Sequence, residues 1–398
     1  MSISYSSVLY MIYGTSLHSK MGVRFLNTLI KRKAPSALKY VSLSQYSGNT
    51  IVIDTSIYIH KYLASNSLME SMYFMISQFK YLNITPVFIF DGVAPAEKKG
   101  VLNARASVRE NALEQYNRLD TLLHKSVEPS SSTEVATSSS CECPEQIRRR
   151  MQSLKRRFVR ISNFELNELK RLMREFGVQY IESDGESDLL CAYLVKCGFA
   201  QVCMSDDMDL FLYGCPVVIR YVNIWHSTGV EYTLDRILRD MAVSLHGFQM
   251  VCILSGTDYT SNGGGGDSEI DLGSKPSTRH LKFRIYLSEL VDSYQEYQDS
   301  RVLDDYTEQP QTHFDSAFYE WIVERHKKQV PMNACDLQLA RTTFEKAYSI
   351  FSCDPSSEMK QYVQTMRDTT TRTETNDPGY EVPHKVKRIM AKYNFIYI

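Results

Sequence analysis

Short apolar runs rich in β-branched residues recur along the first two thirds of the chain, and several end on an acidic residue. Thr50–Asp54 and Pro86–Gly92 are continuously apolar before their acids, which is typical of strands buried on both faces. Val178–Glu182, Ala200–Met204 and Cys215–Val222 have a similar character. These runs predict a parallel α/β sheet whose functional site lies beyond the carboxyl ends of its strands.

Apolar residues spaced three and four apart predict helices between these strands. We expect helices within Ile57–Tyr81, Phe164–Gly177 and Asp315–Lys328, and a buried helix over Gly247–Tyr259. Ser183 and Glu186 have the spacing of a capping box, so the next helix is expected to begin near Glu186.

Acidic residues gather at the ends of these predicted segments. Two pairs have i, i+2 spacing, and their mutual repulsion is costly unless a divalent cation or solvent offsets it. Any one of these acids could be an ordinary surface residue on a turn, but the set favours a cation site. Its seven members are Asp54, Asp91, Glu186, Asp188, Asp207, Asp209 and Asp258.

Composition sets broad limits. With 398 residues and 43% hydrophobic content, the chain can bury one large core or two smaller ones. The formal net charge of −1 says little about partners. Nine cysteines without paired spacing favour a reducing compartment. No run of eighteen or more apolar residues is present, so no membrane span is expected.

The charges are nonetheless sorted along the chain. Basic residues punctuate a long helical stretch from Lys98 to Arg118, and the polar segment Ser126–Ser140 is predicted to be a flexible loop. Arg148–Arg160 then carries seven basic residues and no acid. Its apolar residues predict a helix with one anchoring side and one side for polyanions, although a solvated helix face is the alternative. The anchoring residues would be Met151, Leu154, Phe158 and Ile161.

The ordered segments MGVRFLNTLI, IVIDTS, PVFIFDG, IESDGESDLLCAYLVKCG, SDDMDLFLYGCPVVIR and ILSGTDY resemble the motifs of the flap endonuclease/XPG family of structure-specific nucleases. The resemblance covers about Met21–Arg109 and Leu166–Tyr259, and the chain looks like a divergent member of the family, with a viral source as one alternative. It implies a PIN-like α/β fold: a central, mostly parallel twisted sheet, helices on both faces, a helical arch and a mainly helical C-terminal region. It also implies metal binding by the seven acids, with Asp188 standing where the family has a glutamate.

The same resemblance implies nucleic-acid contacts. Lys98 and Arg105 match basic arch residues at the scissile phosphate and, with Glu186 and Asp188, are the predicted catalytic residues. His60 stands where relatives often have a tyrosine that stacks on a base. The predicted DNA-binding residues are Gly22, His60, Lys98, Arg105, Arg109, Arg148, Arg149, Arg156, Arg157, Lys275 and Arg279.

After Asp258 the chain departs from the family. TSNGGGGDSEIDLGSK replaces a glycine-rich helix-two-turn-helix turn, so duplex recognition is expected to be weaker or to use Lys275, Arg279, Lys282 and Arg284. The final YNFIYI lacks the family's sliding-clamp peptide. We expect initiation at Met21. The predicted regions are a dispensable extension at 1–20, an N-terminal nuclease region at 21–125, a loop and basic arch segment at 126–165, an internal nuclease region at 166–260 and a divergent region at 261–398.

The expected activity is cleavage of DNA at flaps or single-strand/duplex junctions, with two Mg²⁺ or Mn²⁺ ions held by carboxylates. Asp54, Asp91, Glu186 and Asp188 would serve the hydroxide-generating ion, Asp207 and Asp209 its partner, and Asp258 would act through water. A magnesium phosphotransferase, a PIN-class ribonuclease and an inactive DNA-binding scaffold are the alternatives. We expect a monomer in the nucleus, or at a cytoplasmic replication site for a viral member.

Overall fold

Seven strands form one sheet in the order β1-β7-β6-β5-β2-β3-β4. The computed structural model describes residues 23, 25–125, 143–260, 286–301, 313–326, 334–370 and 382–393. Strands β2 to β6 are parallel, and β7 runs antiparallel to both β6 and β1 at one edge. The strands are β1 Leu38–Ser42, β2 Thr50–Asp54, β3 Thr85–Phe90, β4 Gln179–Glu182, β5 Val202–Met204, β6 Val217–Asn223 and β7 Thr228–Thr233.

All five strands expected from the apolar runs are present, and the prediction of a mostly parallel sheet is confirmed. Two strands, β1 and β7, were not expected. β1 forms an edge of the sheet and has a single buried residue, and β7 next to it carries half-buried residues among its buried ones. A short strand with polar residues interspersed carries little signal in sequence.

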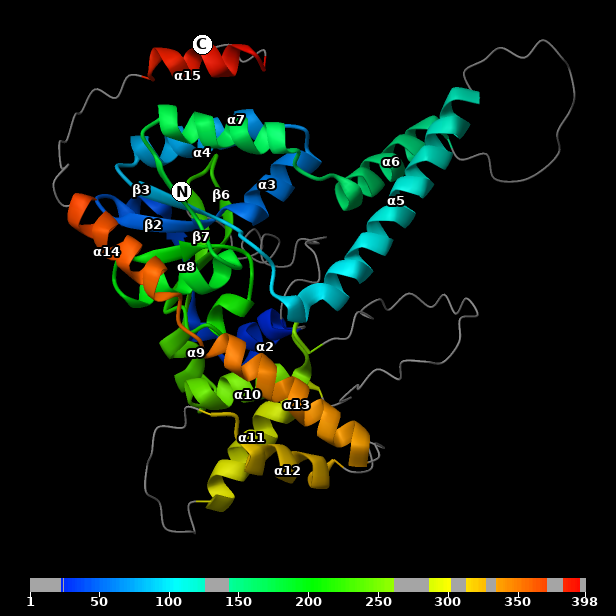
Figure 1. The fold of residues 1–398 in the computed structure, drawn as a ribbon, viewed down its shortest axis with the longest axis vertical. Helices are drawn as coiled ribbons and strands as arrows, with labels where there is room; N and C mark the ends of the chain where they lie inside the picture. The colour runs from blue at the N-terminus through cyan, green and yellow to red at the C-terminus, as the bar shows by residue number, and fades with distance from the viewer. Residues whose placement is uncertain are drawn as a thin grey trace, which may run out of the picture.

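Helices cover both faces of the sheet (Figure 1). They are α2 Leu26–Lys33, α3 Thr55–Ala64, α4 Leu68–Tyr81, α5 Lys99–Lys125, α6 Pro144–Phe158, α7 Asn163–Glu175, α8 Ser187–Lys196, α9 Leu234–Asp240, α10 Leu245–Ser255, α11 Leu287–Arg301, α12 Ser316–Arg325, α13 Ala334–Phe351, α14 Ser357–Thr370 and α15 His384–Ala391. Short 3-10 helices lie at Pro35–Ala37, Leu43–Tyr46, Ala96–Lys98 and Asp209–Phe211 (η1 to η4).

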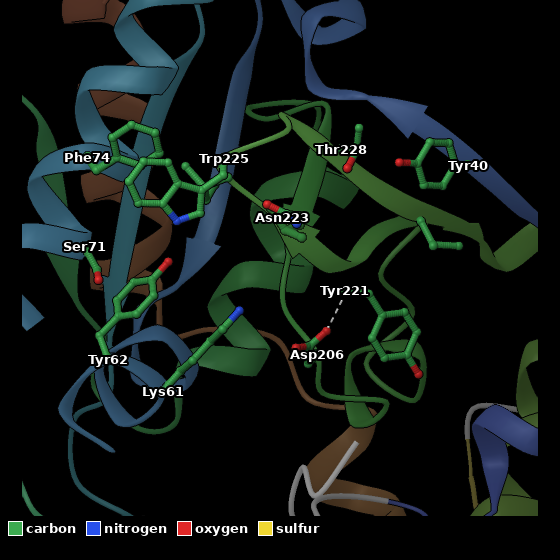
Figure 2. A pocket seen from close by; sticks show the side chains of 13 residues that line it. Tyr40, Lys61, Tyr62, Ser71, Phe74, Asp206, Tyr221, Asn223, Trp225 and Thr228 are labelled. Atoms are coloured by element: carbon green, nitrogen blue, oxygen red, sulfur yellow. Dashed lines mark hydrogen bonds between the residues drawn. The ribbon is translucent and has the colours of Figure 1, made fainter. Parts of the chain in front are cut away.

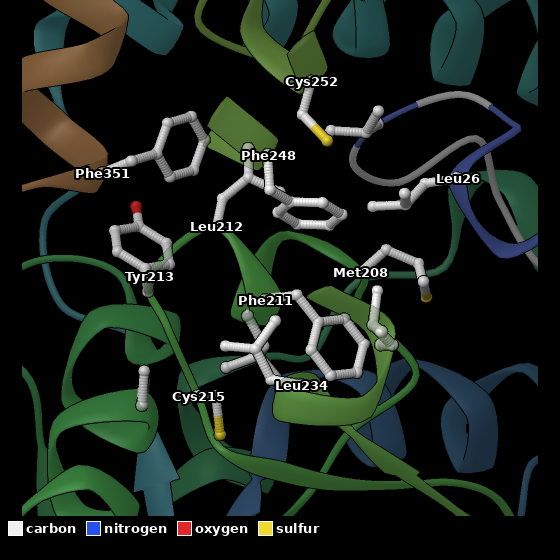
Figure 3. Close-up of a cluster of buried hydrophobic side chains, with 14 of the residues drawn as sticks. Leu26, Met208, Phe211, Leu212, Tyr213, Cys215, Leu234, Phe248, Cys252 and Phe351 are labelled. Atoms are coloured by element: carbon white, nitrogen blue, oxygen red, sulfur yellow. The ribbon is translucent and has the colours of Figure 1, made fainter. Parts of the chain in front are cut away.

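The alternation of side chains along β2 divides the core in two. Ile51 and Ile53 pack into the layer formed with α3, α4, α7 and α15, whereas Val52 faces the layer that contains α2, α8 and α10 to α14. Figure 3 shows part of the second layer, where Phe211 and Tyr213 lie among side chains of α10 and Phe351 of α13. The C-terminal helices are therefore packed onto the same core as the sheet.

Helices α5 and α6 pack against each other and project from the body (Figure 1). Their shared core is small and consists of Ala112, Leu119, Ile147, Met151 and Leu154. The basic segment is thus helical with an apolar anchoring side, as its pattern predicts. Ile161 is an exception, because α6 ends at Phe158 and Ile161 packs on the larger core instead.

The helix expected to begin near Glu186 is confirmed as α8, with Glu186 as its N-cap. The expected capping box is absent, because Ser183 donates only to the carbonyl oxygen of Glu186, at 3.2 Å. Helix α10 ends at Ser255, which leaves Asp258 in the following turn rather than on the helix. In the described ranges no single helix is long and apolar enough to cross a membrane; only the bent pair α9–α10 reaches that length and composition.

Gly247 allows α10 to contact α11 closely. A β-carbon at this position would lie 2.1 Å from Cε1 of the buried Tyr294. We expect Gly247→Ala to lower the free energy of unfolding by about 1–3 kcal/mol, as overpacking does, in urea denaturation. Adding Tyr294→Leu should recover part of the loss. Gly185→Ala is the matched control, because its β-carbon would meet nothing closer than 3.9 Å; equal losses in both single variants would contradict the packing argument.

Candidate active site

The carboxylates that end β2 and follow β3 lie side by side at the carboxyl edge of the sheet. Asp54, only 3% exposed, accepts hydrogen bonds from Ser205 Oγ (2.9 Å) and Ser187 Oγ (3.1 Å). Asp91 accepts from the amide of Ser187 at 2.9 Å and from the hydroxyl of Ser56. Helix α8 begins at Ser187, so hydrogen bonds from the amide and hydroxyl of Ser187 hold both aspartates beside the start of that helix.

The approach of α8 to this edge depends on a close backbone contact. Gly92 follows Asp91, and its amide donates to the carbonyl oxygen of Gly185 at 2.7 Å. A β-carbon on Gly92 would lie 1.9 Å from the carbonyl oxygen of Ser183. The contact brings Glu186, the N-cap of α8, and Asp188 in its first turn to the edge of the sheet.

The turn after β5 supplies the next two carboxylates. Ser205 Oγ accepts a hydrogen bond from the amide of Asp207 (3.0 Å), and Asp207 Oδ1 accepts from the amide of Asp209 (2.9 Å). Asp209 in turn accepts from the amide of Val23 at 3.0 Å. Both aspartates are buried, so backbone amides provide much of their local stabilisation.

Two basic side chains from the base of α5 reach this cluster. Lys98 Nζ lies 2.7 Å from Glu186 Oε2 and 4.5 Å from the ring centroid of Tyr259, and Arg105 Nη2 lies 2.5 Å from Asp258 Oδ2. The Tyr259 hydroxyl also donates to Glu186. The structure therefore brings all seven predicted acids into one electrostatic cluster with Lys98 and Arg105.

The buried carboxylates lack sufficient counter-charge. Burial and the neighbouring Asp91 raise the pKa of Asp54 to about 7. Burial and Asp207 raise the pKa of both Asp188 and Asp209, and burial raises that of Asp207. Burial alone would lower the pKa of Lys98, but Glu186 and Asp188 outweigh it and raise that pKa.

Arg220 on β6 stabilises the turn after β5 that carries Asp207 and Asp209. It is buried, and its guanidinium donates to the Asp206 carbonyl oxygen (2.7 Å) and to Asn27 Oδ1 (3.0 Å). Asn27 also accepts from the Tyr232 hydroxyl at 2.9 Å and donates to the Tyr221 hydroxyl at 2.7 Å. This network links α2 and β6 to the backbone immediately before Asp207.

The donor set suits a hard divalent cation, since all seven predicted ligands are carboxylates. As the side chains lie, however, no three Asp, Glu, His or Cys residues of the described chain converge closely enough to hold an ion. Glu186 is turned onto Lys98 and Tyr259, and Asp258 onto Arg105. The residues fit such an ion in their chemistry, and convergence of three of them around one ion would require these side chains to reorient.

The other predicted nucleic-acid contacts are spread over the body and the α5–α6 pair. His60 is exposed on α3. Arg148, Arg149 and Arg157 are exposed on α6. The structure does not describe the side chain of Arg156, and the predicted residues Gly22, Lys275 and Arg279 lie outside the described residues, as does the loop 126–140.

Several residues that position the acids were missed. Ser56, Ser187 and Ser205 hold Asp54 and Asp91, and Tyr259 holds Glu186. Their positions one or two residues from the acids were the available signal, but serine is so common in turns that spacing alone does not reveal the partner.

Comparisons with known proteins agree with this geometry. The XPG N-terminal domain matches residues 21–112, and the XPG I-region matches residues 177–258. Flap endonuclease 1 of Xenopus tropicalis is 28% identical over 273 residues, which covers 63% of this chain and 65% of that protein. Flap endonuclease 1 of Entamoeba dispar is 29% identical over 258 residues, covering 60% and 62%. The chain thus spans just under two thirds of the length of these curated relatives.

Two solved structures share the fold. The catalytic core of Rad2 in complex with DNA substrate aligns with a TM-score of 0.50 and 18% identity, covering 93% of this chain and 95% of that one. Human GEN1 in complex with Holliday junction DNA aligns with a TM-score of 0.51 and 15% identity, covering 93% and 73%. At these identities the likeness shows the PIN-like fold alone.

The raised pKa of Asp54 predicts how stability depends on pH without divalent cations. Between pH about 4, the ordinary aspartate range, and pH about 7, the folded state holds a proton that the unfolded state has released. The free energy of unfolding should therefore fall as pH rises through this window. Asp54→Asn should reduce the fall by on the order of 2 kcal/mol, measured by urea denaturation in EDTA at pH 5 and pH 8.

Asp299→Asn on α11 is the matched control, because Asp299 is exposed and distant from the site in sequence. It should leave the pH dependence unchanged. A parent protein whose free energy of unfolding rises across this pH window, or an Asp54→Asn variant with a steeper fall, would contradict the raised pKa of Asp54.

Proposed function

The chain belongs to the flap endonuclease/XPG family, and on that premise we propose that it is a divalent-metal-dependent nuclease that cleaves DNA at flaps or single-strand/duplex junctions. The observation that carries the proposal is the cluster of seven carboxylates at one sheet edge beside Lys98 and Arg105. The buried acids are short of positive charge, as a cation site would be. Replication, repair or recombination of DNA, in a nucleus or at a viral replication site, is the proposed setting.

The proposed cofactor is a pair of Mg²⁺ ions, with Mn²⁺ as a substitute, held by the seven carboxylates. When bound, such ions activate water and offset charge on the reacting phosphate and the leaving oxygen. Around them, Ser205 and Ser187 hold Asp54 in place, and backbone amides hold Asp207 and Asp209. Ligands that are already held in place do not have to reorganise during the reaction.

Lys98 and Arg105 have a second proposed role. In the structure they pair with Glu186 and Asp258; Lys98 ends η3 directly before α5, and Arg105 lies in the second turn of α5. A bound phosphate offers these cations an alternative anion. Lys98 would then bind the reacting phosphate and stabilise its developing charge, while Arg105 would orient the neighbouring phosphate.

Retention of all seven acids argues against an inactive scaffold, because loss of a ligand is the simplest route to inactivity. RNA is the alternative substrate, which would make the protein a ribonuclease. The experiment that tests the proposal compares flap, nicked, junction and single-stranded DNA with RNA of the same sequence, in Mg²⁺ and in EDTA. Cleavage of RNA alone would replace the DNA assignment.

The carboxylate pair after β5 should be essential for cleavage but not for DNA binding. Asp207→Ala should reduce cleavage of flap DNA by at least about 100-fold, since it removes a proposed ligand rather than a group that binds DNA. DNA affinity measured by fluorescence anisotropy should change little. Asp299→Asn serves as control and should cleave normally; turnover retained by Asp207→Ala would remove the metal assignment.

The α6 cluster should contribute affinity that depends on salt. Neutralising Arg148, Arg149, Arg156 and Arg157 together should weaken DNA binding. It should also flatten the slope of log affinity against log salt by about 0.7–0.9 for each phosphate that these arginines neutralise in the parent. Cleavage of the bound DNA should fall less than in Lys98→Ala. The matched control neutralises Lys385 and Arg388, which are exposed on α15. An unchanged slope would leave α6 as a solvated helix face.

A further inference from the structure

Helix α14 lies beside α8, the helix whose start carries two of the seven acids (Figure 1). Polar contacts join the two helices near both ends of α8. Ser356 Oγ, directly before α14, donates to Asp184 Oδ2 at 2.7 Å, shortly before α8 begins. Arg367 Nη2, near the end of α14, donates to the carbonyl oxygen of Cys197 at 2.9 Å, where α8 ends. The contacts follow the same order along both helices, so α14 runs parallel to α8 over its length.

Apolar and cation–π contacts fill the space between these ends. Met359 and Val363 of α14 are buried in the same core as Leu190 of α8. Lys360 Nζ lies 5.8 Å from the ring centroid of Tyr193, which is also on α8. Helix α14 is therefore packed along the whole of α8 rather than touching it at one point.

The hydroxyl of Ser356 connects two elements. It accepts a hydrogen bond from the amide of Met359 at 3.2 Å, which caps the first turn of α14, and it donates to Asp184. The carbonyl oxygen of Asp184 accepts from the amide of Val93, in the loop after β3, at 3.3 Å. The segment that leads into Glu186 is thus held by the loop after β3 and by the start of α14.

Arg367 acts at the opposite end of α8. Cys197 is the C-cap of that helix, and a carbonyl oxygen in the last turn has no partner within the helix. The Arg367 guanidinium supplies one and also places positive charge at the negative end of the helix dipole. The positive end of the same dipole lies at the carboxylate cluster, where the amide of Ser187 donates to Asp91.

The start of α8 needs support that does not depend on the acids. Ser187 donates to Asp54 and Asp91, whose oxygens a bound cation would also use. The turn after β5 has such support, because Asp206, which is not among the seven acids, accepts from the amide of Tyr221 on β6 at 2.8 Å. Figure 2 shows this hydrogen bond in the wall of a pocket of about 390 Å³. For α8, the contacts with α14 provide the corresponding support.

We propose that α14 positions α8 for cation binding, with Ser356 and Arg367 as its positioning residues. The inference rests on the proposed function and extends it to a part of the chain beyond the XPG I-region match at residues 177–258. Neither side chain would contact the ion. Both would keep Glu186 and Asp188 at the edge of the sheet while the acids exchange hydrogen bonds for a bound ion.

Binding of Mn²⁺ without DNA tests the proposal. The double variant Ser356→Ala/Arg367→Ala should bind Mn²⁺ about 10-fold more weakly, the lower end of the range for residues that orient metal ligands. The measurement is the electron paramagnetic resonance signal of free Mn²⁺ in a titration. Ser356→Thr/Arg367→Lys should recover most of the affinity, because threonine also caps helices and lysine can still donate to the carbonyl oxygen.

Ser162→Ala is the matched control. It also removes a serine that caps a helix, since Ser162 Oγ accepts from the amide of Glu165 at 3.2 Å. Its helix, α7, belongs to the other apolar layer of the core. The control should bind Mn²⁺ with the affinity of the parent protein.

Hydrogen exchange in EDTA separates positioning of α8 from general stabilisation. In the Ser356→Ala/Arg367→Ala variant, amides of α8 should exchange roughly 10-fold faster than in the parent, the effect of losing one or two hydrogen bonds. Amides of α10, which packs in the same core, should exchange at the parent rate.

The outcomes separate the two proposals. Parent-like Mn²⁺ affinity in the double alanine variant, or equal acceleration of exchange in α8 and α10, would overturn the role of α14. Cleavage of flap DNA by the parent in Mg²⁺ would then leave the nuclease function standing. A parent that neither binds Mn²⁺ nor cleaves DNA would overturn both.

Discussion

Repulsion between like charges is the constraint on which this structure depends. Four aspartates, Asp54, Asp188, Asp207 and Asp209, are buried within one cluster, and burial raises the pKa of each. Serine hydroxyls, backbone amides and Lys98 offset part of this cost. Burial of apolar residues in the two layers on either face of the sheet offsets the rest of this cost. The same layers fix the positions of the strand ends.

Lys98 and Arg105 offset only part of this negative charge. Lys98 ends the 3-10 helix η3 directly before α5, and Arg105 lies in α5, which shares a small apolar core with α6. The two helices pack mainly on each other and project from the body (Figure 1). The pair can therefore move relative to the body at lower cost than an element packed into the main layers.

Sequence alone predicted the five parallel strands and all seven acids, because a buried strand must be continuously apolar and Asp54 or Asp91 ends such a run abruptly. It could not reveal β1 and β7, because short strands with polar residues among the apolar ones carry little signal. It also missed Ser205, Tyr259 and Arg220, since their roles depend on contacts across the fold: Tyr259 meets Glu186 from 73 positions away. The α10 boundary was wrong because the expected helix ran through Gly256, where the backbone leaves the helix with a φ of 108°.

The contacts of Tyr259 have a consequence for how the protein can be divided. Its hydroxyl contacts both Glu186 and the hydroxyl of Tyr213, and both tyrosine rings pack against Phe351 of α13. The match to the XPG I-region ends at residue 258, yet Phe351 of α13 completes the wall behind Tyr259. A fragment cut at the end of that match would therefore lack the aromatic partner of two residues that support Glu186.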